Sequence, residues 1–271
     1  MHSIINEIIS STEKRVQQLE METNPEKKDI MREEKRDIIA AIKEKGLQKK
    51  VAVIAEVKPA SPGKKLMDIQ PYDAARIAKE MERAGAVAVS VLTEPEFFHG
   101  SLNNLESVRK NVTIPILRKD FIINKLQLDE TRSDLILLIA GILGEELDHM
   151  VNLSFNKGFE PLVEIHDRIE LERALRTKAK LIGINNRDLR TLEIDLDTTL
   201  KLAPLIKEFD LNNSSEHIII SESGLHSRQD IKKVIDAGAD AVLVGTSIIK
   251  DGDIYTKTKE LVDTFDEFEM D

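Results

Sequence analysis

The chain has 271 residues, 41% of them hydrophobic and 32% charged, which suits one large α/β domain or two small ones. It has no cysteine, which excludes disulfides, thiolate metal ligands and a cysteine nucleophile. The net charge of −10 argues against nucleic acid as a partner, because the phosphate backbone would be repelled, and an anionic small substrate would need locally placed cations.

Residues 1–50 differ in composition from the rest, being rich in Glu, Lys and Arg, with a break at Asn24-Pro25. Two solvated helices would explain this composition, and a flap packed across one end of a barrel is the alternative. Glu7 and Glu13 interrupt the apolar residues, unlike in a secretory signal. The longest apolar run, 135–143, is shorter than the roughly 20 residues needed to cross a bilayer. We therefore expect a cytoplasmic protein without a membrane partner.

From Val51 onward, eight short runs of β-branched and other apolar residues alternate with longer amphipathic stretches. The runs start at Val51, Ala86, Ile114, Leu135, Pro161, Leu181, His217 and Ala241. Nearly continuous apolar runs are typical of parallel strands that are covered on both faces. The sequence thus predicts a (β/α)8 TIM barrel over residues 51–271, preceded by an N-terminal helical extension over residues 1–50.

Two helices of this barrel are marked by their ends. The segment 72–84 is amphipathic and stops at Gly85, while 227–237 starts with the capping residue Ser227 and stops at Gly238. After Asp251 the sequence predicts a last helix that ends in an acidic, solvated tail.

Charged side chains stand where the first and third predicted strands end. In barrels of this type the chemistry lies at the carboxyl ends of the strands, so Glu56, Lys58 and Lys119 are candidate catalytic residues. A lysine inside a ring of strands is costly to desolvate unless an anion or acid-base chemistry compensates. The alternative is that each lysine only forms an ion pair with Glu56 or Asp120.

The fifth and sixth predicted strands also end in polar residues. Glu164 follows three apolar residues and is a candidate acid-base group, with a structural salt bridge to a lysine as the alternative. Asn185 and Arg187 suit the recognition of hydroxyls and oxyanions. Turn formation is the competing explanation for these residues, and for Asn186 in particular.

The last two predicted strands end in small residues, SESG at 221–224 and GTS at 245–247. Such loops expose backbone N–H groups to an anion, and barrels commonly bind phosphate at this corner. A tight turn would explain either loop alone. Two such loops on adjacent closing strands favour a phosphate site.

Aromatic residues follow the second and third strand ends. Phe97, Phe98 and Phe121, together with Pro62, could form the wall of a pocket for a flat ring, and core packing is the alternative. The histidines have no metal-ligand spacing, so no metal site is predicted.

Seven motifs in colinear order between Ala52 and Lys250 resemble the indole-3-glycerol phosphate synthase family of tryptophan biosynthesis. The motifs are AEVKPASPG, SVLTEPEFFHGS, PILRKDF, PLVEIHD, IGINNRDL, SESG and AVLVGTS. The resemblance implies a (β/α)8 barrel that converts 1-(2-carboxyphenylamino)-1-deoxyribulose 5-phosphate to indole-3-glycerol phosphate, carbon dioxide and water. Proton donors and acceptors suffice for this chemistry, so no cofactor is expected.

The resemblance also implies residue roles. Lys119 would be the general acid for ring closure, and Glu164 the general base in dehydration, with Lys58 as its partner acid or as a ligand of substrate anions. Hydroxyls and lysines would be oriented by Glu56, Asn185 and Glu222. The phosphorylated small-molecule substrate would be held by Ser61, Arg187, Ser223, Gly224, Gly245 and Thr246, and its ring enclosed by Pro62, Phe98, Phe121 and Leu138.

Two features depart from the family's usual pattern. Gly63 stands where a serine is common, and the segment 122–134 is a few residues shorter than usual. We expect the third helix of the barrel to be clipped or irregular and its local stability to be low.

Two other functions fit parts of the same pattern. Another phosphosugar barrel, such as a phosphoribosyl isomerase or a Schiff-base aldolase using Lys119 or Lys58, is the closest rival enzyme. A catalytically silent barrel serving as a binding module is the other class, and the retention of Glu56, Lys119 and Glu164 argues against it. The sequence leaves open the oligomeric state and whether other tryptophan-pathway enzymes are partners.

Overall fold

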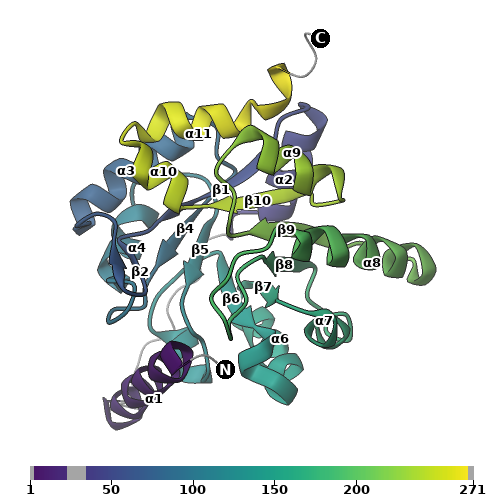
Figure 1. Cartoon of the computed structure of the whole chain (residues 1–271). Helices are drawn as coiled ribbons and strands as arrows, with labels where there is room; N and C mark the ends of the chain where they lie inside the picture. Colours follow the sequence, from purple (N-terminus) through teal and green to yellow (C-terminus); the bar gives the residue numbers. More distant parts are fainter. Residues whose placement is uncertain (1–2, 23–34, 268–271) are drawn as a thin grey trace.

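The computed structural model describes residues 3–22 and 35–267, and its centre is a closed barrel of eight parallel strands (Figure 1). The strand order around the barrel is β1-β10-β9-β8-β7-β6-β5-β4. All eight predicted strands are present, so the (β/α)8 prediction is confirmed. The strands are β1 (Ala52–Val57), β4 (Ala88–Leu92), β5 (Ile116–Lys119), β6 (Leu135–Ile139), β7 (Glu160–Ile165), β8 (Leu181–Asn185), β9 (Ile218–Glu222) and β10 (Ala241–Val244).

Helices follow the strands and form the outer layer. They are α3 (Pro71–Arg83), α4 (Leu102–Arg109), α5 (Ala140–Leu143), α6 (Leu147–Asn156), α7 (Arg168–Ala174), α8 (Asp197–Asn213), α9 (Arg228–Asp236), α10 (Thr246–Asp251) and α11 (Ile254–Val262). The predicted helices at 72–84 and 227–237 correspond to α3 and α9. The Ser227 side chain caps α9, and Gly85 and Gly238 adopt positive φ after α3 and α9, as helix-ending glycines do.

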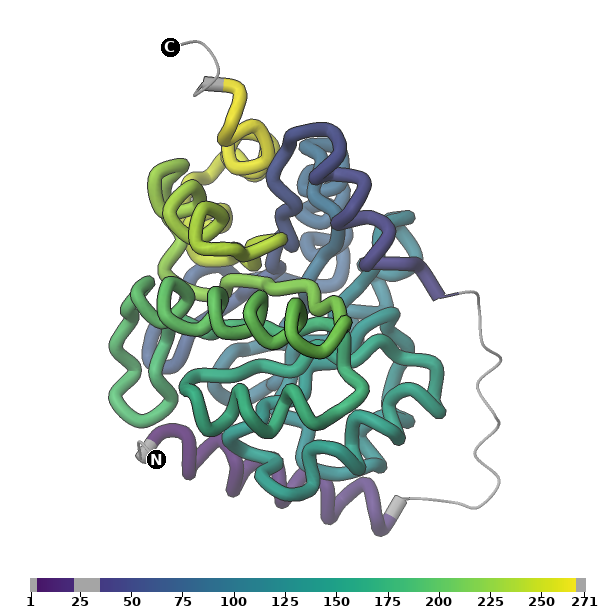
Figure 2. Tube along the Cα trace, turned by 90° about the vertical axis from the view of Figure 1, so that its right-hand side faces the viewer, coloured from purple at the N-terminus to yellow at the C-terminus, as the bar shows by residue number. Residues whose placement is uncertain are grey.

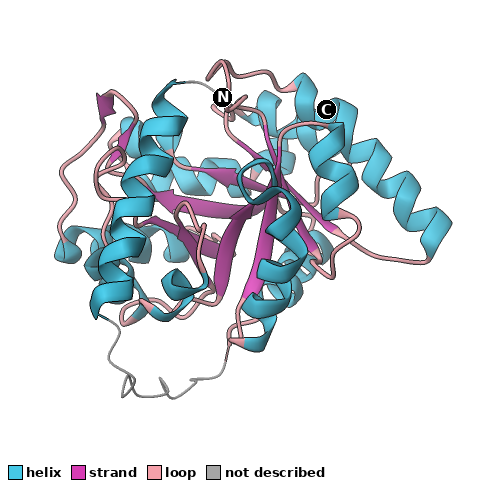
Figure 3. Ribbon diagram, turned by 90° about the horizontal axis from the view of Figure 1, so that it is seen from below, coloured by secondary structure: helices cyan, strands magenta, loops and turns pink. Residues whose placement is uncertain are grey.

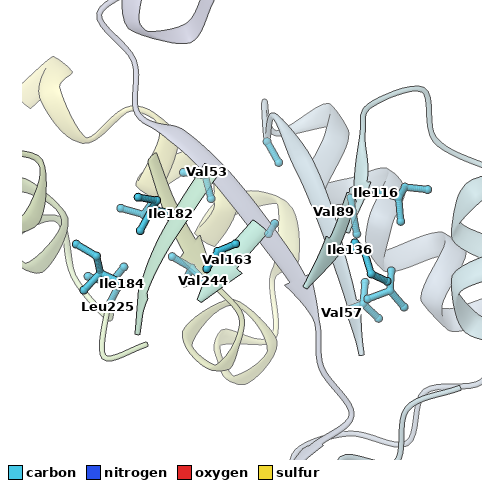
Figure 4. Packing of buried hydrophobic residues seen from close by; sticks show 14 of the residues in the cluster. Val53, Val57, Val89, Ile116, Ile136, Val163, Ile182, Ile184, Leu225 and Val244 are labelled. Carbon is cyan, nitrogen blue, oxygen red and sulfur yellow. The ribbon is translucent and has the colours of Figure 1, made fainter. Parts of the chain in front are cut away.

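Alternation along the strands separates two buried clusters. The outer cluster packs the strands against the helices, and Figure 4 shows members of it such as Val53, Val89 and Ile182. The inner cluster fills the barrel and includes Ile54, Leu117 and Leu162. The inner positions two residues further along these three strands are charged, namely Glu56, Lys119 and Glu164. The barrel interior therefore changes from apolar to polar at its carboxyl end.

The connection between β5 and β6 contains no α-helix, as expected from its length. A single 3-10 turn, η1 (Lys125–Asp129), takes the place of the third helix. The buried Gln127 side chain holds this turn by accepting from the Ile123 amide and donating to the Phe121 carbonyl, at 2.8 and 2.9 Å. The irregular helix is confirmed, and its low local stability stays a prediction.

The two helices of the N-terminal extension, α1 (Ser3–Glu22) and α2 (Ile38–Leu47), lie at opposite ends of the barrel. In Figure 2, α1 runs along the lower edge and α2 lies near the top, and in Figure 3, seen from below, α1 lies in front of the strands. Ile5 and Ile8 of α1, like Ile38 and Ile42 of α2, are buried in the inner cluster.

Two solvated helices are therefore the wrong interpretation of residues 1–50, and a flap across one end of the barrel is the right one for α1. The predicted break at Asn24-Pro25 lies outside the described residues. That residues 1–50 form a unit separate from the barrel stays a prediction.

Three shorter elements complete the chain. A hairpin of β2 (Ala60–Ser61) and β3 (Lys64–Lys65) follows β1, and Gly63 in its turn has a φ of 73°, a conformation that suits glycine better than the serine common in the family. The turn η2 (Gly144–Glu146) precedes α6, and η3 (Thr264–Glu267) follows α11. The predicted last helix is α11, and residues 268–271 of the expected acidic tail are not described. No helix within residues 3–22 and 35–267 is long and apolar enough to cross a bilayer.

Candidate active site

The charged inner residues and the loops beyond them line one pocket at the carboxyl end of the barrel, with a volume of about 210 Å³. Every predicted site residue except Leu138 and Phe97 lines it, and Phe97 packs against the inner cluster instead. These residues are Glu56, Lys58, Ser61, Pro62, Phe98, Lys119, Phe121, Glu164, Asn185, Arg187, Glu222, Ser223, Gly224, Gly245 and Thr246. They come from seven strand ends and are therefore gathered by closure of the barrel.

Leu138 was predicted to enclose a ring, and this prediction is wrong. Leu138 is fully buried in the outer cluster between strands and helices. Its neighbours Leu137 and Ile139 line the pocket, because successive side chains of β6 point to opposite faces of the sheet.

Lys119 lies between two glutamates at the centre of the pocket wall. Its Nζ is 2.9 Å from Glu164 Oε2 and also contacts Glu222 Oε2. The predicted alternative for Lys119, an ion pair with Asp120, is not what the structure has, because Asp120 pairs with Arg15 and Arg118 at 2.9 Å.

Lys58 does have the ion-pair partner that the sequence offered. Its Nζ lies 3.6 Å from Glu56 Oε1, and it also lies 5.9 Å from the centre of the Phe98 ring. A cation held against a ring is favourable. Both contacts keep the ammonium group of Lys58 at the pocket wall.

The burial of Lys119 opposes its charge, but the charges of Glu164, Glu222 and Glu56 outweigh that effect and raise the pKa of Lys119. Burial likewise favours a neutral Glu164, but Lys119 and His166 outweigh it and hold the pKa of Glu164 below its usual range. In the resting site Lys119 is therefore protonated and Glu164 is ionised.

Glu222 behaves in the opposite way to Glu164. Burial, with added repulsion from Glu164 and Glu56 against the attraction of Lys119, raises the pKa of Glu222 to about 7. Gly183 makes this buried position possible, because a Cβ there would overlap Oε1 of Glu222. Glu164 and Glu222 contact the same ammonium group, that of Lys119. Their pKa values differ because only Glu164 has a second cation, His166, beside it.

Replacing Glu222 with glutamine should stabilise the protein above pH 7. Folding raises the pKa of Glu222 from 4.5 to about 7, so the stability that this proton provides is present below pH 4.5 and is lost as the pH rises to about 7. Glutamine does not ionise, and the gain at pH 8 should be about 3 kcal/mol. Urea unfolding at pH 5 and pH 8 measures it. A gain of the same size at both pH values would contradict the prediction.

Two pocket-lining glutamates each have one oxygen without a hydrogen bond, and one guanidinium group at the pocket has no carboxylate partner in the described part of the chain. Oε1 of Glu56 and Oε1 of Glu222 are buried and accept no hydrogen bond from the protein. Arg187 is half-buried and donates to the Leu192 carbonyl at 2.9 Å, and no carboxylate pairs with it within the described part of the chain. Burial alone lowers the pKa of Arg187. The site therefore offers acceptors for hydroxyl groups and a free cation for an anion.

The two small-residue loops lie side by side where β9 and β10 end. Ser223 and Gly224 both have positive φ, 69° and 80°, which turns the backbone sharply at the pocket rim. Ser247, in the first turn of α10, donates to the Leu225 carbonyl at 3.0 Å and joins the two loops. Positive φ at the non-glycine Ser223 is the kind of strain found at ligand sites.

Asn186 has the structural role that the sequence left open for it. Its side-chain amide is buried and donates to the carbonyls of Glu222 and Ser223 at 2.9 and 3.0 Å, while its Oδ1 accepts from Thr199. Asn186 thereby ties the end of β8 to the loop after β9 and positions the loop without facing the pocket.

One side of the pocket is aromatic. The rings of Phe98 and Phe121 are 6.0 Å apart and tilted by 39°. The loop that carries Phe98 is organised by the buried Glu94, whose carboxylate accepts from the amides of Glu96, Phe97 and Phe98 at 2.8–3.0 Å. Glu94 was not predicted as a site residue, although an acid that precedes two aromatic residues by three positions is a signal of such a loop.

Helix α1 closes part of the mouth and was not predicted to reach the pocket. Ile5 lines the pocket, and Arg15 pairs with the buried Asp120 at 2.9 Å. Thr93 donates to the same carboxylate at 2.7 Å. An amphipathic helix rich in charges gives no local signal of such a contact.

The donor set does not suggest a metal centre. Within the described ranges, no group of three or more His, Asp or Glu side chains is arranged to hold a metal ion.

Comparisons with known proteins agree on one family. A family model described as indole-3-glycerol phosphate synthase matches residues 5–261. A protein of that name from Dehalococcoides mccartyi is 46% identical over 231 residues, covering 82% of this chain and 85% of the relative. A protein of the same name from Aquifex aeolicus is 41% identical over 215 residues, covering 78% and 80%.

Among solved structures, the N-acetylmannosamine-6-phosphate 2-epimerase from Clostridium perfringens has a similar fold, with a TM-score of 0.59 and 16% identity. The match covers 83% of this chain and 96% of the epimerase. At this identity the likeness concerns the barrel fold alone.

Proposed function

The chain belongs to the indole-3-glycerol phosphate synthase family, and we propose that its pocket converts 1-(2-carboxyphenylamino)-1-deoxyribulose 5-phosphate to indole-3-glycerol phosphate, carbon dioxide and water. The observation that carries this proposal is the ammonium group of Lys119, which lies between Glu164 and Glu222 in the same pocket as two anion-binding loops. Acid, base and phosphate site are thus within reach of one phosphorylated substrate.

The substrate would be held at its two ends. Its phosphate would bind the backbone N–H groups around Gly224 and Gly245, aided by Ser223 and Thr246. Its carboxyphenyl ring would lie against Phe98 and Phe121, with Pro62 and Leu137 nearby. The free guanidinium of Arg187 and the ammonium of Lys58 would neutralise its anionic groups, and Ser61 would add a hydroxyl.

Ring closure would come first. The ring carbon that bears the carboxylate attacks the ketose carbonyl, and Lys119 gives a proton to the oxygen as it becomes a hydroxyl group. The attack removes aromaticity and leaves an iminium group. The carbon–carboxylate bond then breaks, its electrons restore the aromatic ring and neutralise the iminium nitrogen, and carbon dioxide leaves.

Dehydration would follow. Glu164 removes a proton from the methylene carbon beside the nitrogen, and the hydroxyl group formed in the first step leaves as water after protonation by Lys58. Glu56, Asn185 and Glu222 would orient the hydroxyl groups and the lysines. The product retains the glycerol phosphate in the anion loops.

The electrostatics of Lys119 favour this reaction over a Schiff-base aldolase. A nucleophilic lysine is activated by a lowered pKa, whereas the carboxylates around Lys119 outweigh its burial and raise the pKa of this residue. Lys119 thus suits proton donation. Borohydride trapping of a substrate on either lysine would favour the aldolase.

Fluorescence tests the proposed function directly. The chain has no tryptophan, so indole formed from the carboxyphenylamino substrate should appear against a low background. We expect a rise in indole fluorescence that needs both enzyme and substrate and is accompanied by one carbon dioxide per indole. Absence of the signal at high enzyme concentration would overturn the proposal.

A biosynthetic sugar phosphate is retained inside the cell, so we propose the cytoplasm as the place of action. The small-molecule substrate is the partner that the pocket supports, and other enzymes of tryptophan synthesis are possible partners that pull-down from a lysate would identify.

A further inference from the structure

His166 follows the end of β7 and contacts the carboxylate oxygen of Glu164 that Lys119 does not contact. Its Nε2 is 3.3 Å from Glu164 Oε1, close enough for an ion pair although not aligned for a hydrogen bond. Glu164 Oε2 is the oxygen that contacts Lys119. The two oxygens of the proposed general base therefore face two different cations.

Glu170, at the start of α7, holds His166 from the other side. Its Oε2 contacts Nδ1 of His166 at 2.9 Å and accepts from the His166 backbone amide at the same distance. The Glu170 amide in turn donates to the capping side chain of Asp167 at 2.9 Å. A Cβ at Gly141 of α5 would overlap Oε1 of Glu170, so glycine there leaves the room that this carboxylate occupies.

The charges around this chain of contacts come from several elements. Glu164 and Glu170 are the carboxylates in contact with the imidazole. Lys119 from β5 and Glu222 from β9 act on Glu164, and Arg190 from the loop after β8 acts on Glu170. Helix α5, which packs against β7 and α7, has no ionisable side chain.

We propose that His166, held by Glu170, is a positioning residue that fixes the carboxylate of Glu164 and keeps it ionised. The inference rests on the proposed function, because it assigns Glu164 as the base in dehydration. His166 is 6% exposed at its side chain and does not line the pocket, so it acts through Glu164 rather than on substrate.

The proton on His166 stays in place through the working pH range. Burial opposes the charged imidazole, but Glu164 and Glu170 outweigh it and raise the pKa of His166 to about 10. A charged imidazole at this position is a fixed cation and not a proton shuttle. It stabilises the carboxylate form of Glu164 and holds the carboxylate plane toward the pocket.

Two substitutions separate the two contacts of His166. The amide of glutamine reaches about as far as Nε2, so His166→Gln keeps a donor for Glu164, whereas His166→Asn places its amide near Nδ1 and keeps only the contact to Glu170. We expect His166→Asn to lower kcat by roughly 10- to 100-fold with little change in KM, and His166→Gln to recover most of that loss. Equal losses in both variants would overturn the proposal.

The pH dependence of kcat/KM distinguishes a positioning role of His166 from a role in folding alone. Loss of the imidazole charge should raise the pKa of Glu164, so the acidic limb of kcat/KM should move to higher pH in both variants. His217 provides a matched control, since it is also a buried histidine paired with a carboxylate, Asp210, but lies at the opposite end of the barrel. His217→Gln should cost stability and leave the acidic limb unmoved. An unmoved limb in the His166 variants would mean that His166 is only structural.

An NMR titration of the His166 imidazole tests the pairing of His166 with Glu164 without measuring enzyme activity. The His166 signal should remain that of the charged form past pH 8 in the wild-type protein, and its pKa should fall in both Glu164→Gln and Glu170→Gln. If the wild-type protein forms no indole, the proposed function fails, while a His166 pKa that falls in Glu164→Gln still supports the pairing. If the pKa of His166 is the same in Glu164→Gln as in the wild-type protein, the inference is overturned even in an active enzyme.

Discussion

Replacing Lys119 with methionine should lower turnover by about 10²–10⁴-fold, because one positioned general acid typically contributes that much. Methionine has a similar length but no proton to give to the ketose oxygen. Binding of the substrate phosphate should be less affected, since the anion loops lie on other strands. Single-turnover measurement of carbon dioxide release reports the ring-closure step and should slow together with indole formation.

The same substitution should change stability in a pH-dependent way. Without the ammonium group, the buried Glu164 and Glu222 lose their common partner, and the pKa of each should rise. Groups with a raised folded-state pKa stabilise the protein at low pH and lose that contribution as the pH rises through it. The Lys119→Met variant should therefore unfold more readily at pH 8 than at pH 5.

Lys119→Arg is the matched control for these two effects. Arginine retains the positive charge between the carboxylates but does not release a proton at working pH. It should therefore restore much of the stability at pH 8 without restoring turnover. Near-normal turnover in either variant would show that Lys119 is not the acid.

The sequence predicted the barrel well because its signal is repeated. Eight apolar runs followed by turn residues leave few other arrangements, and glycines such as Gly85 and Gly238 mark the helix ends locally. The site residues were found for a related reason. In a closed parallel barrel all carboxyl ends of the strands meet, so Lys119 and Glu164 come together although they are 45 positions apart.

The wrong predictions concern the direction in which side chains point and the contacts between segments that are distant in sequence. Leu138 was placed in the pocket from the family resemblance, whereas the alternation of side chains along β6 turns Leu137 inward and Leu138 outward. The partner of Lys119 was sought next to it in sequence, at Asp120, whereas Asp120 pairs with Arg15 and Arg118. The contact of Arg15 with Asp120 joins segments more than 100 residues apart and has no local signal.

Replacing Glu164 with glutamine should stop the reaction after carbon dioxide has left. Ring closure and decarboxylation need the acid but not this base, so single-turnover experiments should show carbon dioxide release before indole. Indole formation should fall by about 10²–10⁴-fold. Loss of both products to the same extent would mean that Glu164 acts already in the first step.

Glu164→Gln should also change the free energy of unfolding in a way that depends on pH. The pKa of Glu164 is depressed in the folded protein, against the effect of burial, by Lys119 and His166. Such a group adds stability above its unfolded pKa, and the contribution disappears as the pH falls through the folded value. Glu164→Gln should therefore destabilise the protein at pH 8, with a smaller loss at lower pH.

Glu222→Gln should stabilise the protein at the same pH, since the pKa of Glu222 is raised by burial and by Glu164. Both carboxylates contact one ammonium group, so a general effect of neutralising a buried glutamate would shift both variants in the same direction. Opposite signs at pH 8 are expected only if folding lowers the pKa of Glu164 and raises the pKa of Glu222. That division leaves Glu164 ionised as the base at every working pH, whereas Glu222 takes up a proton only as the pH falls below about 7.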